Sequence, residues 1–105
     1  MFDAAYFRER LPLDVRDQSQ TTRGHEPCVK IHLHGGAAFT VVRIVEIGPG
    51  WVVFDTYRKK RQEQPEIRGR VTFAYNAISH VSITLKPTRG VGFQVEDAAI
   101  AGTGR

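Results

Sequence analysis

The clearest pattern along the chain is a regular alternation of apolar and polar residues between positions 71 and 86. A period of two places successive side chains on opposite faces of a β-strand, and the pattern breaks only at residues 77–79. This break is too short for a helix, so it predicts a sharp corner that carries one strand directly into the next. The apolar positions of the two predicted strands are Val71, Phe73, Tyr75, Val81, Ile83 and Leu85.

Three further strands are predicted upstream. Residues 28–34 alternate again, and a turn at Gly35–Gly36 leads into a long strand over 37–47. That strand has apolar residues on both faces, as expected of a strongly bent strand that serves two packing surfaces. A turn at Gly48–Gly50 then precedes a strand over 51–57 that is rich in aromatic and β-branched residues.

One helix is predicted, over Phe2–Leu11. Asp3 can cap its N-terminus, and Pro12 is expected to end it. The residues from 13 to 27 lack periodicity and favour turns, which predicts an irregular linker. After residue 87 the alternation is lost, which predicts a flexible tail.

The predicted fold is mainly β: a small, strongly bent, antiparallel open barrel of five strands with a short N-terminal helix. The 105 residues are enough for one domain and too few for two. We therefore expect the helix and linker in residues 1–27, the barrel in 28–86 and the tail in 87–105.

The net charge is concentrated between Arg58 and Arg70. This window holds six basic and two acidic residues, so it carries +4, which equals the net charge of the whole chain. A basic loop of this kind suits a polyanionic partner, although a solvated loop that binds nothing specific would have the same composition. The basic residues are Arg58, Lys59, Lys60, Arg61, Arg68 and Arg70.

Several classes of protein are disfavoured. Cys28 is the only cysteine, so neither an internal disulfide nor a paired-cysteine metal site is expected. No segment approaches the ~20 apolar residues that span a bilayer, and residues 1–10 lack a signal peptide's apolar core. A cytoplasmic protein without a membrane partner is expected. The chain shows no nucleophile motif, phosphate-binding loop or carboxylate pair, so we expect neither an enzyme nor a cofactor.

The histidines of the chain suggest one alternative, a metal-binding site. His32 and His34 would share one side of the strand over 28–34, and two histidines spaced in this way can bind a divalent metal. His25, Glu26 and His80 could approach them. Because no third ligand stands at a defined spacing, solvent-facing histidines explain the pattern better, and no metal site is predicted.

The segment from Ala74 to Val81, Ala-Tyr-Asn-Ala-Ile-Ser-His-Val, resembles the second motif of the Sm-like family, most closely in its bacterial Hfq branch. In that motif a strand ends in Tyr-Lys-His-Ala-Ile-Ser and turns directly into the last strand. The Ala-Ile-Ser of residues 77–79 matches outright, whereas Tyr75 and Asn76 stand where the family has Lys and His. Val41 occupies the region where the family usually has a glycine.

The resemblance implies a homo-oligomeric ring of about six or seven copies, in which the fourth strand of one copy pairs with the fifth strand of its neighbour. It also implies that single-stranded RNA binds around a central hole. Trp51 or Tyr75 would stack on a base, Asn76 would pair with a base edge, and the basic residues named above would neutralise phosphates.

Two alternatives remain open. The chain could be a non-enzymatic small-barrel module for oligomerisation or protein interaction that binds no RNA. At the level of single residues, Trp51 could pack in the core or at a subunit interface, and Tyr75 could pack in the core. Asn76 could be present only because it tolerates a tight corner.

Overall fold

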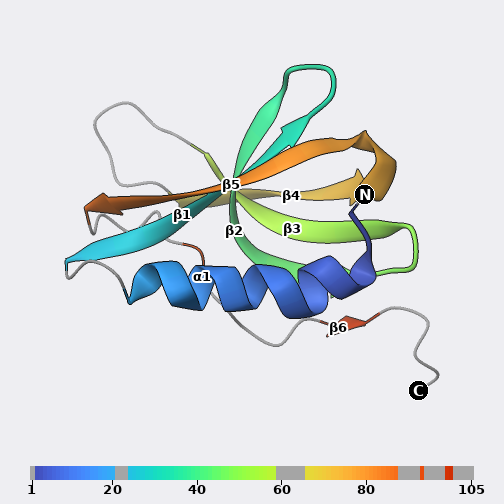
Figure 1. The fold of residues 1–105 in the computed structure, drawn as a ribbon. Coiled ribbons are helices and arrows are strands. Elements are labelled where there is room, and N and C mark those ends of the chain that lie inside the picture. Colours follow the sequence, from blue (N-terminus) through green and yellow to red (C-terminus); the bar gives the residue numbers. More distant parts are fainter. Residues whose placement is uncertain (1, 21–23, 59–65, 88–92, 94–98, 101–105) are drawn as a thin grey trace.

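A computed structural model of the chain describes residues 2–20, 24–58, 66–87, 93 and 99–100. Its main feature is one curved sheet of five long antiparallel strands with a helix beside it (Figure 1). The predicted mainly β fold with five antiparallel strands and an N-terminal helix is confirmed. The long strands are β1 (His25–Leu33), β2 (Ala38–Ile47), β3 (Trp51–Arg58), β4 (Glu66–Ala74) and β5 (Ile78–Pro87), and a short β6 (Ala99–Ile100) pairs in parallel with β2.

The sheet is open. Its long strands follow the order β4-β3-β2-β1-β5, so β4 and β5 lie at its two ends. Within the described residues, no strand pairs with the outer edge of either one. The described strands therefore do not close a barrel by pairing with one another.

Strand β2 changes partners along its length, and bulges explain how it bends. Its first part pairs with β1 and its second part with β3. Two register shifts interrupt the pairing with β3, between Val41 and Arg43 and between Ile44 and Glu46. Such bulges bend a strand and increase its twist. They account for the curvature of β2 without a glycine at position 41.

The N-terminal helix is longer than the sequence predicted. A π-helical turn, η1 (Tyr6–Arg10), continues directly into α1 (Leu11–Ser19). The prediction that the helix ends at Pro12 was wrong, and part of the linker expected over 13–27 is helical. Among the described residues, no helix has the length and apolar content that a membrane crossing requires.

The π-helical turn explains why the proline is tolerated. Pro12 has no N–H group, and it comes two residues after the π-helical turn, at the start of α1. Just before it, the N–H of Leu11 donates to the carbonyl of Tyr6, a wider spacing than in an α-helix. Asp3 caps the helix as predicted, since its Oδ1 accepts a hydrogen bond from the Tyr6 N–H at 2.9 Å.

The helix packs on the sheet through one apolar stripe. Phe7, Leu11 and Val15 recur every four residues and are buried. The Phe7 ring lies edge-on to Phe54, with centroids 5.8 Å apart, and stacks on Tyr75 at 5.7 Å and 12°. The helix thus holds β3 and the corner after β4 in one core.

Part of the expected tail belongs to the fold. Phe93 is buried with its ring 6.2 Å from that of Phe54, and its N–H donates to the Pro27 carbonyl at 2.8 Å. Residues 99–100 form β6 beside β2. The flexible tail predicted over 87–105 was therefore wrong for these residues, and most of the remainder lies outside the described residues.

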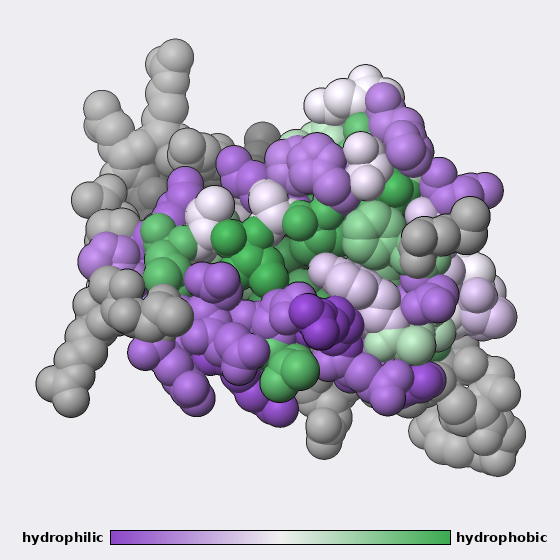
Figure 2. Space-filling model, in the orientation of Figure 1, coloured by the Kyte–Doolittle hydropathy of each residue, from purple (hydrophilic) through white to green (hydrophobic). Residues whose placement is uncertain are grey.

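Half-buried apolar side chains mark the β5 end of the sheet. Val81, Ile83 and Leu85 alternate along β5, and each retains some exposed surface. Val81 and Ile83 also contact the core. Figure 2 shows an apolar band that crosses the molecule between β5 and the helix, with polar surface on either side. The described residues therefore leave part of the apolar surface between β5 and the helix exposed.

Candidate functional site

The predicted corner between β4 and β5 is a short 3₁₀ turn, η2 (Tyr75–Ala77), and it is hydrogen-bonded to the turn between β2 and β3. The Tyr75 hydroxyl donates to the carbonyl of Gly48 at 2.7 Å. The Tyr75 N–H donates to the carbonyl of Gly50 at 3.2 Å. The structure thus brings together the two loops that the sequence placed at one site.

Trp51 lies half-buried against this turn. Its indole N–H donates to Glu46 Oε1 at 3.3 Å, and its carbonyl accepts a hydrogen bond from the Gly48 N–H at 2.8 Å. A Cβ atom added at Gly48 would overlap the Trp51 indole. The indole is therefore held by a carboxylate on one side and by a glycine that leaves room for it on the other.

The three residues expected to contact bases differ in exposure. Asn76 is exposed at the corner, and Trp51 presents part of its ring. Tyr75 is only 6% exposed, because its ring stacks on Phe7 in the core. In the single chain this burial contradicts the expectation that Tyr75 could stack on a base. Its contacts position the corner that carries Asn76.

The basic residues lie away from this corner. Arg58 ends β3, whereas Trp51 begins it, so the two backbones are about 23 Å apart at roughly 3.3 Å per residue. Arg68 and Arg70 lie in β4, which starts earlier than the sequence predicted, and Lys59, Lys60 and Arg61 lie outside the described residues. Among the described residues, Arg58, Arg68 and Arg70 therefore do not share one site with the aromatic-amide corner.

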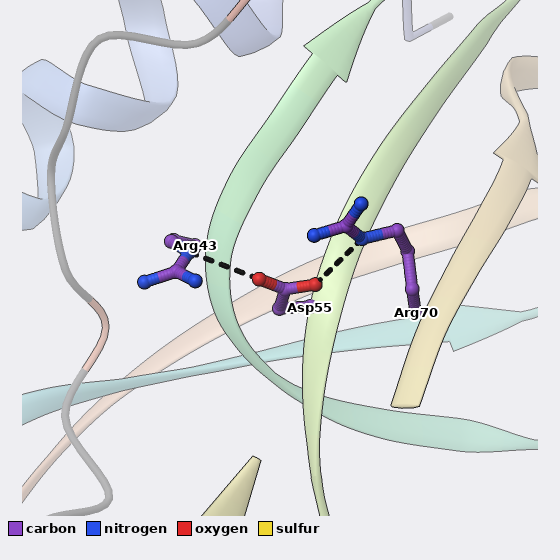
Figure 3. A network of polar contacts seen from close by, with 3 residues as sticks. All are labelled: Arg43, Asp55 and Arg70. Atoms are coloured by element: carbon purple, nitrogen blue, oxygen red, sulfur yellow. Dashed lines mark hydrogen bonds and ion pairs between the residues drawn. The ribbon is translucent and has the colours of Figure 1, made fainter. Parts of the chain in front are cut away.

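Arg43, Asp55 and Arg70 form a row across β2, β3 and β4 (Figure 3). The Asp55 side chain is only 4% exposed, and each of its oxygens accepts one hydrogen bond. Arg43 Nε donates to Oδ2 at 2.9 Å, and Arg70 Nε donates to Oδ1 at 2.8 Å. The row links three strands around one buried negative charge.

These contacts keep Asp55 ionised. The hydrogen bond from Arg70, with the positive charges of Arg70 and Arg43, holds the pKa of Asp55 below its ordinary value of 3.8, although burial acts in the opposite direction. Sequence reasoning missed both Asp55 and Arg43. A signal was present, since a carboxylate inside an otherwise apolar strand needs a charged or hydrogen-bonding partner once it is buried.

The histidines are arranged differently from the sequence expectation. His32 pairs with His80 of β5, and their rings stack at 4.1 Å and 9°. His34 lies beyond the end of β1 and is exposed. Partial burial lowers the pKa of His32, and the nearby His80 and Lys30 lower it further. In the described part of the chain, no group of three or more potential metal ligands occurs.

No family model matches this chain, and comparison with curated proteins and solved structures gave no match either. The chemistry of the site therefore has to come from its own residues. They offer a partly exposed indole, an exposed amide, a buried aspartate with two partly exposed arginines, and a stacked histidine pair. The first two are suited to recognising an unpaired base.

Replacing Tyr75 with phenylalanine should lower the free energy of unfolding by about 1–3 kcal/mol. The substitution keeps the ring but removes the hydroxyl that donates to the carbonyl of Gly48, a buried residue. That carbonyl would lose its partner in a site with little access to water. Urea denaturation followed by circular dichroism measures the change.

Tyr6→Phe is the matched control, because Tyr6 is only half-buried and its hydroxyl makes no hydrogen bond that links the two loops. Its stability should stay within about 0.5 kcal/mol of the natural chain. Equal losses in the two variants would show that the Tyr75–Gly48 hydrogen bond has no special role.

Proposed function

We propose that copies of this chain join through β4 and β5 into a closed ring, and that the ring binds single-stranded RNA. The observation that carries the proposal is the open sheet, whose two end strands, β4 and β5, each have one edge without a strand partner among the described residues. An edge strand presents unpaired N–H and C=O groups, and pairing β4 of one copy with β5 of the next would satisfy both edges at once.

The side chains along these edges support pairing between copies. Val81, Ile83 and Leu85 on β5 are half-buried, as is Val71 on β4. A neighbouring strand would cover the apolar band of Figure 2, which the described residues of one chain leave partly exposed. The resemblance to the Sm-like family supports the same pairing, because it implies that the fourth strand of one copy pairs with the fifth strand of its neighbour.

RNA binding would centre on the turn and corner that carry Trp51 and Asn76. In a ring this unit would repeat once per copy. Aromatic stacking contributes about 1–3 kcal/mol per base, and an exposed amide can hydrogen-bond to a base edge. Because the basic window lies toward the other end of β3, it would contact phosphates outside this base-binding unit, so the binding would depend on salt.

A second candidate is an oligomerisation or protein-interaction module that binds no RNA. It uses the same two edges and needs no base-binding residue. The separation of Trp51 from Arg58 along β3 favours it, since the described basic residues do not lie beside the residues that would bind bases. The two candidates therefore agree on the assembly and differ on RNA.

Two measurements test the proposal. Native mass spectrometry should give a particle of about six or seven copies. Titration with a short single-stranded RNA should give submicromolar affinity that weakens as salt rises. Trp51→Ala and Asn76→Ala should each weaken binding about 5- to 100-fold, while Arg16→Ala on the exposed side of the helix should not.

The outcomes separate the two candidates. A particle containing one copy would remove the ring and the RNA site built on it. A ring that binds RNA only weakly, or equally in all three variants, would leave the interaction module as the function.

A further inference from the structure

The carboxylate of Glu46 borders the indole of Trp51. Glu46 lies near the end of β2 and Trp51 begins β3, so the short turn between the strands brings the two side chains together. The indole N–H donates to Glu46 Oε1 at 3.3 Å. Because an indole N–H lies in the plane of its ring, the carboxylate lies beside the edge of the ring and not over its face. A base stacked on the exposed part of the ring would therefore bring its own edge near this carboxylate.

The carboxylate keeps capacity to accept further hydrogen bonds. An ionised carboxylate is an acceptor only, with about four lone-pair sites on its two oxygens. The indole takes one of these sites, and no other side chain among the described residues donates to Glu46. Glu46 is half-buried, so its side chain retains contact with water. Lone pairs of Glu46 are therefore left for a bound ligand.

Hydrogen bonds connect this pair to the corner that carries Asn76. The Gly48 N–H donates to the carbonyl of Trp51, and the Gly48 carbonyl accepts a hydrogen bond from the Tyr75 hydroxyl. Asn76 follows Tyr75 in the η2 corner and is exposed. The indole, the carboxylate and the amide thus belong to one hydrogen-bonded unit, which offers a stacking surface and two polar side chains for base edges.

A carboxylate distinguishes bases by the donors on their edges. Adenine, cytosine and guanine each carry an exocyclic amino group, which donates hydrogen bonds. Uracil has no amino group, and its ring N–H stands between two carbonyl oxygens that repel a carboxylate. Cytosine and uracil are single rings of the same size, so their stacking on an indole differs little. A difference in affinity between them would come from their edges.

We propose that Glu46 makes this unit select bases that carry an amino group and disfavour uracil at the position stacked on Trp51. The inference rests on the proposed RNA binding and adds its base preference. One hydrogen bond changes an equilibrium about 2- to 10-fold, and the repulsion between uracil carbonyls and the carboxylate acts in the same direction.

Fluorescence anisotropy titrations with oligocytidine and oligouridine of equal length, at one salt concentration, test the preference. The natural chain should bind oligocytidine at least about fivefold more tightly. Glu46→Gln keeps the size of the side chain and an oxygen for the indole N–H, but its amide can also donate to a uracil carbonyl. The ratio of the two affinities should therefore fall to within about twofold. The ratio is the readout, because removal of one negative charge changes both affinities alike.

Glu9→Gln is the matched control, since it removes the same charge from an exposed position on the helix. It should keep the ratio of the natural chain. Trp51 is the only tryptophan, so its emission spectrum shows in each variant whether the indole keeps its surroundings.

Equal binding of the two oligomers by the natural chain, or tighter binding of oligouridine, would overturn the proposal without any variant. A Glu46→Gln chain that kept the natural ratio would also overturn it, because Glu46 would then only hold the indole. If the natural chain bound neither oligomer, the proposed RNA binding itself would fail, and the base preference with it.

Discussion

Replacing Phe7 with alanine is expected to lower the free energy of unfolding by about 3–5 kcal/mol. Phe7 is fully buried, and its ring contacts Phe54 of β3 and Tyr75 of the η2 corner. Removal of the ring loses buried apolar surface and leaves a cavity where the helix meets the sheet. Total stabilities of small domains are about 5–15 kcal/mol, so the loss should be large in urea denaturation.

Leu13→Ala on the same helix is the matched control. Leu13 is 49% exposed, and it faces away from the buried stripe of Phe7, Leu11 and Val15. Alanine is also a good helix former, so this variant should stay within about 0.5 kcal/mol of the natural chain. A small effect at Phe7 would show that the helix does not stabilise the sheet as the packing indicates.

Replacing Asp55 with alanine is expected to cost about 3 kcal/mol of stability, near the lower end of the range for removing one partner from a buried ion pair. The substitution leaves two guanidinium groups side by side without their shared carboxylate. Both retain some contact with water, since the side chains of Arg43 and Arg70 are 33% and 60% exposed. This contact with water limits the loss of stability.

Arg70→Ala should cost clearly less stability than Asp55→Ala, because the exposed Arg70 is removed while Asp55 keeps its bond to Arg43. The pH dependence gives a second readout. The lowered pKa of Asp55 means that its contribution is complete above 3.8, the ordinary value, and is lost as the pH falls through the lower folded value. Asp55→Ala should lack this part of the acid destabilisation. If Asp55→Ala lost stability at acid pH as the natural chain does, the assignment of this loss to Asp55 would be contradicted.

Much of the sheet could be predicted from alternation alone. The period of two identified four of the five long strands, aromatic and β-branched residues identified β3, and the short break at residues 77–79 identified the corner before β5. Alternation is sufficient where one face of a strand is in the core and the other outside, as in β4 from Val71 to Ala74. The start of β4 was missed, since residues 66–70 carry charge and follow Pro65, and alternation gives no signal there.

The helix and the C-terminal residues show where local pattern fails. Pro12 normally ends a helix, and only the hydrogen bonding of the preceding π-helical turn shows why it does not. Phe93 stands among residues without periodicity, so nothing nearby indicates that its ring enters the core beside Phe54. Both features depend on contacts with distant parts of the chain.

The candidate site depends on contacts that the sequence does not show. The resemblance implied that Trp51, Tyr75 and Asn76 lie around one RNA site, and in the structure Tyr75 donates to Gly48 in the turn before Trp51. Alternation placed Tyr75 on the same face as Val71 and Phe73, so packing in the core was one of two open interpretations, and the burial of Tyr75 supports that one. The pairing of His32 with His80 was also out of reach, since it depends on the register between β1 and β5.

The two uncovered edges belong to different strands, and this difference gives any edge-to-edge assembly a direction. Every copy would add with its helix on the same side, so the two surfaces of the particle would differ in chemistry. A copy damaged along only one edge could still attach by the other and would then stop growth at that point. A minority of such copies could therefore prevent completion of many particles, and the damage would act as a dominant defect.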